Sequence, residues 1–196
     1  MTTTKPAPAR RMGPQGSEVW HSMLDGAEDL LREEGHAQLT SRRIAERIGV
    51  KQRLVYYYFH TMDDLVVALF RRLSERELKR LRAALASPHA LREIWDTNVG
   101  STDARLISEF MALANRIEDL RAEVIHFIEE ARAIEIEAVE AALQRKGARS
   151  AIPAPALAII ASSVALALSR ERQLGVSSGH EAVLEVVNGF LQTLED

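Results

Sequence analysis

Apolar side chains recur every three to four residues along most of this 196-residue chain, which is the spacing of amphipathic helices. Glycine and proline are scarce inside these stretches, and the alternation typical of strands with turn pairs does not recur. The pattern therefore predicts an all-α fold. Besides two short helices between residues 40 and 60, it places longer helices at residues 17–34, 61–86, 90–99, 103–115, 117–146, 155–174 and 179–194.

The segment from Thr40 to Leu65 is the most informative part of the chain. Its first apolar face is broken by Gly49, and a second apolar face begins at Val55. Two short helices joined by a tight turn are expected, and such a pair can present its second helix to the major groove of DNA. The apolar positions of the pair are Ile44, Ala45, Ile48, Val50, Val55 and Phe59.

Positive charge is concentrated on the same segment. At 100° per residue, Arg53 and Tyr57 lie about 160° and 200° around the second helix from Val55, so both face away from the core. The chain carries a net charge of −3, whereas residues 40–60 carry five cations against one acid. This local excess fits a surface that faces phosphates. The cations are Arg42, Arg43, Arg47, Lys51 and Arg53.

The order of these residues resembles the DNA-binding domain of TetR-type bacterial transcriptional regulators. The motif comprises Thr40, Ile44-Ala45, Gly49-Val50, Val55-Tyr56, Tyr58-Phe59 and Asp64-Leu65. The resemblance implies a homodimer whose N-terminal domains bind a double-stranded DNA operator and whose C-terminal domains dimerise and bind a small-molecule inducer. It also implies phosphate contacts by Thr40 and Tyr58. With Arg42 from the basic cluster, the predicted DNA-binding residues are Thr40, Arg42, Lys51, Gln52, Arg53, Tyr56, Tyr57 and Tyr58.

Four positions depart from the family pattern. Ile48 and Lys51 stand where the family usually has smaller residues, Arg53 replaces a glycine, and Met62 replaces a phosphate-binding lysine. The loss of that lysine removes one phosphate contact, while Lys51 and Arg53 add two cations nearby. We therefore expect the backbone contacts to be redistributed and not lost.

The chain divides into three predicted parts. Residues 1–16 are expected to form a disordered basic arm, residues 17–60 the helix-turn-helix domain, and residues 61–196 the ligand-binding and dimerisation domain. In the arm, Lys5, Arg10 and Arg11 are either DNA contacts or part of a solubilising tail. No apolar stretch of the kind found in a secretory signal follows them. The helix at 61–86 links the two domains and is the expected lever between them.

Two C-terminal helices are predicted to form the dimer interface. Apolar residues cover nearly the whole circumference of the helix at 155–174, so two of its faces need covering, and the helix at 179–194 has a second broad apolar face. A homodimer through these helices is expected, the alternative being that both are buried within one subunit. Pro155, Ser162 and Ser163 interrupt the apolar run, which argues against a membrane span.

No motif defines the inducer site. Its candidates are polar or aromatic residues within apolar stretches. Glu135 lies about 20° from Val124 on its helix and should point inward, where a carboxylate needs a partner. Three roles stay open for it: an ion pair with Arg105 or Arg116, a ligand contact, or gating by protonation. The candidate ligand-binding residues are Trp95, Phe110, Met111, Asn115, Phe127 and Glu135.

The remaining motifs argue against an enzyme. The chain has no cysteine, which excludes disulfides and thiolate sites, and its six histidines show no metal-binding spacing. It has no glycine-rich phosphate loop and no nucleophile with a neighbouring histidine. We expect a cytoplasmic transcriptional regulator that acts as a repressor, without cofactor or metal. The alternative is a helical dimer that binds a small molecule but has lost specific operator binding.

Overall fold

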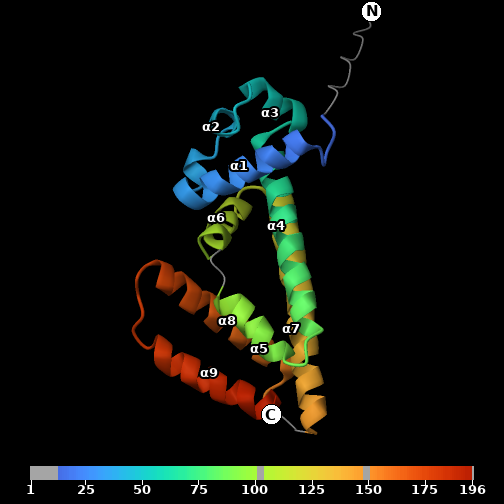
Figure 1. Cartoon of the computed structure of the whole chain (residues 1–196), viewed down its shortest axis with the longest axis vertical. Helices are drawn as coiled ribbons and strands as arrows, with labels where there is room; N and C mark the ends of the chain where they lie inside the picture. The colour runs from blue at the N-terminus through green and yellow to red at the C-terminus, as the bar shows by residue number, and fades with distance from the viewer. Residues whose placement is uncertain (1–12, 101–103, 148–150, 196) are drawn as a thin grey trace, which may run out of the picture. The chain divides into compact units, whose positions relative to one another are not determined.

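The computed structural model describes residues 13–100, 104–147 and 151–195, and its described part contains only helices (Figure 1). The predicted all-α fold is confirmed, whereas residues 1–12 of the predicted arm lie outside the described residues. The helices are α1 (Glu18–Glu34), the 3-10 turn η1 (His36–Gln38), α2 (Ser41–Arg47), α3 (Gln52–Tyr58), α4 (Met62–Leu85), α5 (Ala90–Val99), α6 (Ala104–Ala114), α7 (Glu118–Lys146), α8 (Ala154–Gln173) and α9 (His180–Glu195).

The chain forms two compact units, one up to Phe70 and one from Arg71 onward. We call them the head and the body. The division lies within α4, which contributes its first turns to the head and the remainder to the body.

Local hydrogen bonds explain where the helices of the head begin and end. The side chain of Ser17 accepts from the backbone N–H of Trp20 at the start of α1, and Gly35 with φ of 83° ends that helix. Gly49 adopts φ of +70° in the turn between α2 and α3, a conformation that favours glycine. At the start of α4, Thr61 and Asp64 cap each other's backbone N–H groups at 2.9 and 3.0 Å.

Buried apolar side chains join α1, α2, α3 and the start of α4 in the head. Met23 and Leu24 from α1, Ile44 from α2 and Val55 from α3 are almost fully buried. The indole of Trp20 stacks on the ring of Phe59 with 6.0 Å between centroids. Phe59 lies just after α3 and not inside it, yet its side chain is buried as the sequence indicated. Burial of this apolar surface is what fixes α3 on α1 and α2.

The body is built around the long helix α7, which packs against α5, α6, α8 and α9. Its core combines aliphatic residues of α4, α5, α7, α8 and α9 with the indole of Trp95. Helix α6 packs on α7 and α8 and contributes the buried residues Leu106, Phe110 and Leu113. The left-handed Gly147, at φ of 58°, ends α7.

Helices α8 and α9 bury one face and leave an apolar face exposed. On α8, Ala158, Ala165 and Leu168 are buried within the body. The exposed large apolar residues are Ile159, Ile160 and Leu166 on α8, and Val186 and Phe190 on α9. By length and composition alone, α8 is apolar enough to cross a membrane. It packs on α5 and α7, yet only 22% of this apolar stretch is buried within the chain.

Candidate nucleic-acid interface

A buried hydroxyl connects α2 to α3. Ser41 at the start of α2 is 4% exposed, and its Oγ donates a hydrogen bond to the Tyr56 hydroxyl at 3.0 Å. The same Oγ accepts from the side-chain amide of Gln52 at 2.9 Å. Gln52 and Tyr56 lie one turn apart on α3, so both bonds restrain one face of that helix. Sequence reasoning placed Gln52 and Tyr56 among the DNA contacts but did not identify Ser41.

Three of the five predicted cations are paired with carboxylates inside the head. Arg42 contacts Glu46 at 2.8 Å, Arg43 contacts Glu34 at 2.6 Å, and Arg47 contacts Glu33 at 2.6 Å. The hydrogen bond from Arg47 lowers the pKa of Glu33, so this pair stays charged at neutral pH. Glu46 is already counted within residues 40–60, so Glu33 and Glu34 of α1 balance two of the four excess positive charges.

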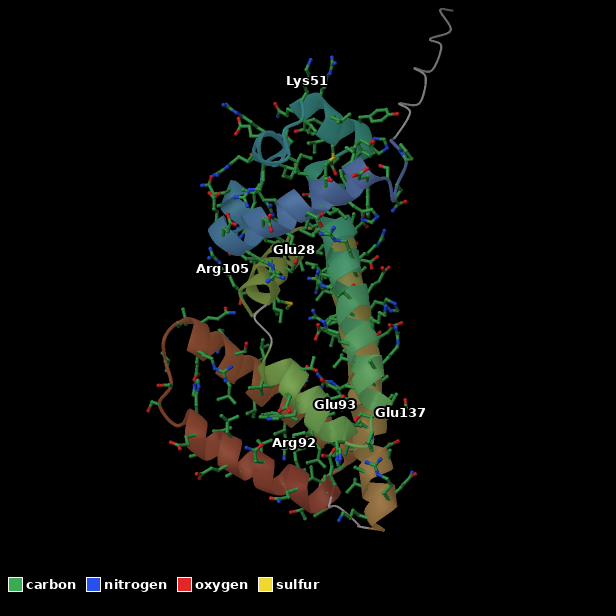
Figure 2. All side chains as sticks on the ribbon, viewed as in Figure 1. Glu28, Lys51, Arg92, Glu93, Arg105 and Glu137 are labelled. Carbon is green, nitrogen blue, oxygen red and sulfur yellow. The ribbon has the colours of Figure 1, made fainter. Side chains whose placement is uncertain are left out.

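The uncompensated cations lie on α3 and at its start. Among the described residues, no ion pair or hydrogen bond involves the side chains of Lys51 and Arg53, and both are exposed. Figure 2 shows Lys51 projecting outward from the head at the turn before α3. Tyr57, one turn after Arg53, is 43% exposed. As the sequence predicted, Arg53 and Tyr57 point away from the core and form one polar face of α3.

Thr40 keeps a hydrogen-bond donor available. Its hydroxyl oxygen accepts from the backbone N–H of Arg43 at 3.3 Å and thereby caps α2. Because a hydroxyl both donates and accepts, its proton remains free to donate to a phosphate oxygen.

Tyr58 does not fit the phosphate contact that the family resemblance implied. Its ring is 9% exposed and packs edge-on against Tyr57, with 5.4 Å between centroids. The backbone of Gly13 closes over the same two rings, and its N–H donates to the carbonyl oxygen of Tyr57 at 2.9 Å. We therefore assign Tyr58 to the core of the head and omit it from the proposed contacts.

Residues 23–69 match the family model described as "Bacterial regulatory proteins, tetR family". The match places residues 23–69, which lie within the head, in the TetR family of DNA-binding domains. The HTH-type transcriptional repressor Rv3405c of Mycobacterium tuberculosis is 39% identical over 82 residues, which are 41% of this chain and 44% of that protein. The uncharacterized HTH-type regulator Rv2912c of the same species is 27% identical over 121 residues, 58% of this chain and 62% of that protein. The chain thus spans less than two thirds of these relatives' length, and both are regulators, not enzymes.

Solved structures share the fold of the chain. A TetR transcription regulator from Haloarcula marismortui superposes with a TM-score of 0.75 at 19% identity, covering 89% of this chain and 97% of that one. The regulator FadR from Bacillus subtilis, solved with stearoyl-CoA, superposes with a TM-score of 0.62 at 14% identity, covering 90% and 98%. The fold likeness therefore includes the body, where the sequence match is weak.

The six residues predicted to bind ligand do not share one environment. Trp95 and Phe110 are buried in the body, and Phe127 packs half-buried against the core. Met111 and Asn115 are exposed on and just after α6, so the expectation that they line an interior site is wrong for this arrangement. Both follow apolar positions in sequence, but they lie on the outward side of the helix.

Glu135 points inward as predicted, with different partners. Its carboxylate accepts from the side-chain amide of Asn98 on α5 at 3.1 Å and lies 3.5 Å from Nε of Arg132. The predicted partners Arg105 and Arg116 are both exposed instead. We call Asn98, Arg132 and Glu135 the polar cluster. Burial raises the pKa of Glu135, and the hydrogen bonds from Asn98 and Ser162 together with the Arg132 charge compensate only partly.

Glu135→Gln should stabilise the body, and more so at high pH. A carboxyl whose pKa is raised by folding binds its proton more tightly in the native state, so wild-type stability falls as pH rises from the unfolded pKa through the folded one. Glutamine avoids the charge and can still accept from Asn98. We expect a melting temperature about 2–4 °C higher at pH 8, which corresponds to roughly 1 kcal/mol in a chain of this size, and a smaller difference at pH 4.

The matched control for this measurement is Glu137→Gln, because Glu137 is an exposed acid two residues further along α7. It should leave the melting temperature unchanged at both pH values. A melting temperature of Glu135→Gln below that of the wild type at pH 8 would contradict the prediction. It would show that the charged carboxylate stabilises the body through Arg132.

Proposed function

We propose that the chain is a ligand-responsive transcriptional repressor that binds a palindromic DNA operator as a homodimer. The observation that carries the proposal is the exposed surface of α3 and its start, where Lys51 and Arg53 make no ion pair or side-chain hydrogen bond among the described residues and Tyr57 is 43% exposed. The family match of residues 23–69 and the naming of the relative Rv3405c as a repressor support it. A protein that regulates bacterial transcription in this way acts in the cytoplasm.

Each exposed group of the head has a distinct proposed role. Arg53 and Tyr57 face the groove and contact base edges or the adjoining backbone, and Lys51 contacts a phosphate at the start of α3. Thr40 donates its hydroxyl proton to a second phosphate. The exposed pair Arg42 and Glu46 leaves Arg42 able to exchange its carboxylate for a phosphate, because exposed ion pairs contribute little stability. The side chains of Gln52 and Tyr56 are hydrogen-bonded to Ser41, and they contact DNA in the orientation that these bonds fix.

The proposed occupant of the exposed apolar faces on α8 and α9 is a second copy of this chain. Ile160 is 53% and Val186 74% exposed, and a body with such residues on two helices leaves a large apolar surface in water. On α9 this face also carries the small residues Ala182 and Gly189, which permit close helix approach. A two-fold interface places the same faces opposite each other and covers both.

The polar cluster is the proposed ligand contact in the body. Nε of Arg132 is buried and donates no hydrogen bond within the described part of the chain, although it lies beside the desolvated carboxylate of Glu135. A ligand that supplies an acceptor there would satisfy it. The fold neighbour FadR from Bacillus subtilis was solved with a bound small molecule, stearoyl-CoA, in agreement with ligand binding by this type of fold.

Selection from a random duplex pool tests the proposed function most directly. We expect the recovered sequences to share a palindrome whose half-sites lie roughly 34–36 Å apart, one helical turn, or a multiple of this. Binding that weakens with salt would exclude the alternative of a dimer that has lost its operator. Recovery of no common sequence, with no salt-dependent duplex binding, would overturn the proposal.

Ser41→Ala should weaken operator binding without changing its salt dependence. The substitution removes both hydrogen bonds between α2 and α3, each worth roughly 0.5–1.5 kcal/mol, and frees Gln52 and Tyr56 to adopt other rotamers. We expect a roughly 3- to 10-fold higher Kd for the selected operator, and less discrimination against mismatched duplexes. Fluorescence anisotropy at several KCl concentrations measures both effects.

The control for this experiment is Ser22→Ala on α1, whose hydroxyl donates, within the described part of the chain, to the carbonyl oxygen of Glu18 in its own helix. It should bind like the wild type. A less steep salt dependence in Ser41→Ala would contradict the positioning role, since no phosphate-binding cation has been removed.

A further inference from the structure

The hydrogen bonds that join α2 to α3 run in one direction. The side-chain amide of Gln52 donates to Oγ of Ser41 at 2.9 Å, and Ser41 donates its own proton to the hydroxyl oxygen of Tyr56 at 3.0 Å. Ser41 is 4% exposed, so its proton needs an acceptor inside the head, and among the described residues the Tyr56 oxygen provides it. The order of donors is therefore Gln52, then Ser41, then Tyr56.

This order determines which atoms of Gln52 remain available to DNA. A primary amide has two N–H donors and one oxygen that accepts. One N–H of Gln52 is bonded to Ser41, whereas its Oε1 makes no hydrogen bond within the described residues, and the side chain is exposed. Gln52 therefore presents an acceptor, together with one remaining N–H, on the exposed surface of α3.

This combination of acceptor and donor matches adenine among the four bases. In the major groove only adenine and cytosine present a donor, which is their exocyclic amino group, and only adenine has an acceptor, N7, next to it. Guanine presents the acceptors N7 and O6, which would face the oxygen of Gln52. Gln52 is the first residue of α3, and the N-terminal residues of a recognition helix are those that contact base edges.

We infer that Gln52 selects adenine in each half-site of the operator, because Ser41 and Tyr56 hold its amide in one orientation. The inference rests on the proposed function, and it names the base that this surface of α3 recognises. Ser41 and Tyr56 are positioning residues for this contact, since they act on the base through Gln52. Without them the amide can rotate and present both N–H groups, which fit the two acceptors of guanine.

Gln52→Glu tests the inference as a change of base preference. A carboxylate accepts but does not donate, so it pairs with the amino group of cytosine and loses the N–H that reaches N7 of adenine. In selection from a random duplex pool, we expect one half-site position to change from adenine to cytosine on the same strand. Anisotropy with all four base pairs at that position should show that the wild type prefers adenine by roughly 5- to 150-fold per half-site.

The matched control is Gln144→Glu, which makes the same chemical change at an exposed position near the end of α7. It should select the same sequences as the wild type. Melting temperatures of both variants verify that the head stays folded, as expected for substitutions of exposed side chains.

Tyr56→Phe tests the positioning role while leaving Gln52 in place. The substitution removes the acceptor of the Ser41 proton, so Ser41 donates to Oε1 of Gln52 instead and the amide reverses. The NH2 group of Gln52 then faces the DNA. We expect the preference for adenine over guanine to fall by at least about fivefold at the position that responds to Gln52→Glu, although Tyr56 does not contact that base.

A wild-type preference for guanine at the position that responds to Gln52→Glu would overturn the inference, because guanine requires the opposite order of donors. The inference also fails if Gln52→Glu changes no position, or if Tyr56→Phe lowers the affinity for all four duplexes by the same factor. In each of these cases, operator binding by the wild type leaves the proposed function standing. Absence of duplex binding by the unmodified chain would overturn the proposed function, and this inference with it.

Discussion

Ile160→Glu and Val186→Glu should each convert the protein to monomers and weaken operator binding by more than about 100-fold. This factor is the lower end of the gain in affinity that two linked binding sites provide. Both side chains are exposed in the single chain and lie on the faces proposed to meet a second copy. A two-fold axis would bury the new carboxylate twice in an apolar contact without a partner, at a cost of several kcal/mol. A monomer then holds only one half-site, with half of the contacts.

Sedimentation velocity and operator titration measure the two effects separately. The matched control is Ile125→Glu, because Ile125 on α7 is 49% exposed and lies outside the proposed interface. It should leave the protein dimeric. Dimers that survive both Ile160→Glu and Val186→Glu would place the interface elsewhere. A charge at Ala165 is unsuitable for this purpose, since Ala165 is completely buried within one body and its substitution would test folding.

Helix positions were the part of the fold that sequence patterns predicted well. The helix expected at 90–99 is observed with those ends, and the others differ by one or two residues. These ends depend on local chemistry, such as the capping pair of Thr61 and Asp64 or the left-handed Gly147, which the sequence displays directly. The 3-10 turn η1 has no comparable signal and was not predicted.

The ion pairs of the head could not be predicted from the local sequence. Arg43 and Arg47 find their carboxylates on α1, nine and fourteen residues away, and the pairing depends on how α1 and α2 pack. A count of charges over residues 40–60 cannot include those partners. Ser41 was missed for a similar reason, because its two hydrogen bonds exist only once α3 is docked on α2.

In the body too, the sequence predicts which way a side chain points but not which residue it contacts. Helical geometry predicted correctly that Glu135 points inward, because it depends only on position along one helix. Its partner Asn98 comes from another helix, 37 residues away, which no local pattern indicates. Met111 and Asn115 were selected by residue type alone, and the packing of α6 leaves them outside. Direction along a predicted helix was therefore a better guide than chemical type.

Arg53→Ala and Tyr57→Ala should each weaken operator binding strongly while leaving the fold intact. Both side chains project from α3 away from its buried face, so their removal creates no cavity in the head. A base or backbone contact of this kind is worth about 1–3 kcal/mol per head. Because each dimer loses the contact at both half-sites, we expect a loss of about 2–6 kcal/mol, or at least roughly 30-fold in Kd.

Anisotropy with the selected operator and with a scrambled duplex distinguishes the roles of the two residues. If Arg53 reads a base, Arg53→Ala reduces the ratio of specific to non-specific affinity; if it binds phosphate, both affinities fall and the salt slope becomes less steep. Arg145→Ala, an exposed arginine at the end of α7, is the control and should bind like the wild type. Operator affinity that stays unchanged in both α3 variants would show that the face of α3 carrying Arg53 and Tyr57 does not contact the operator.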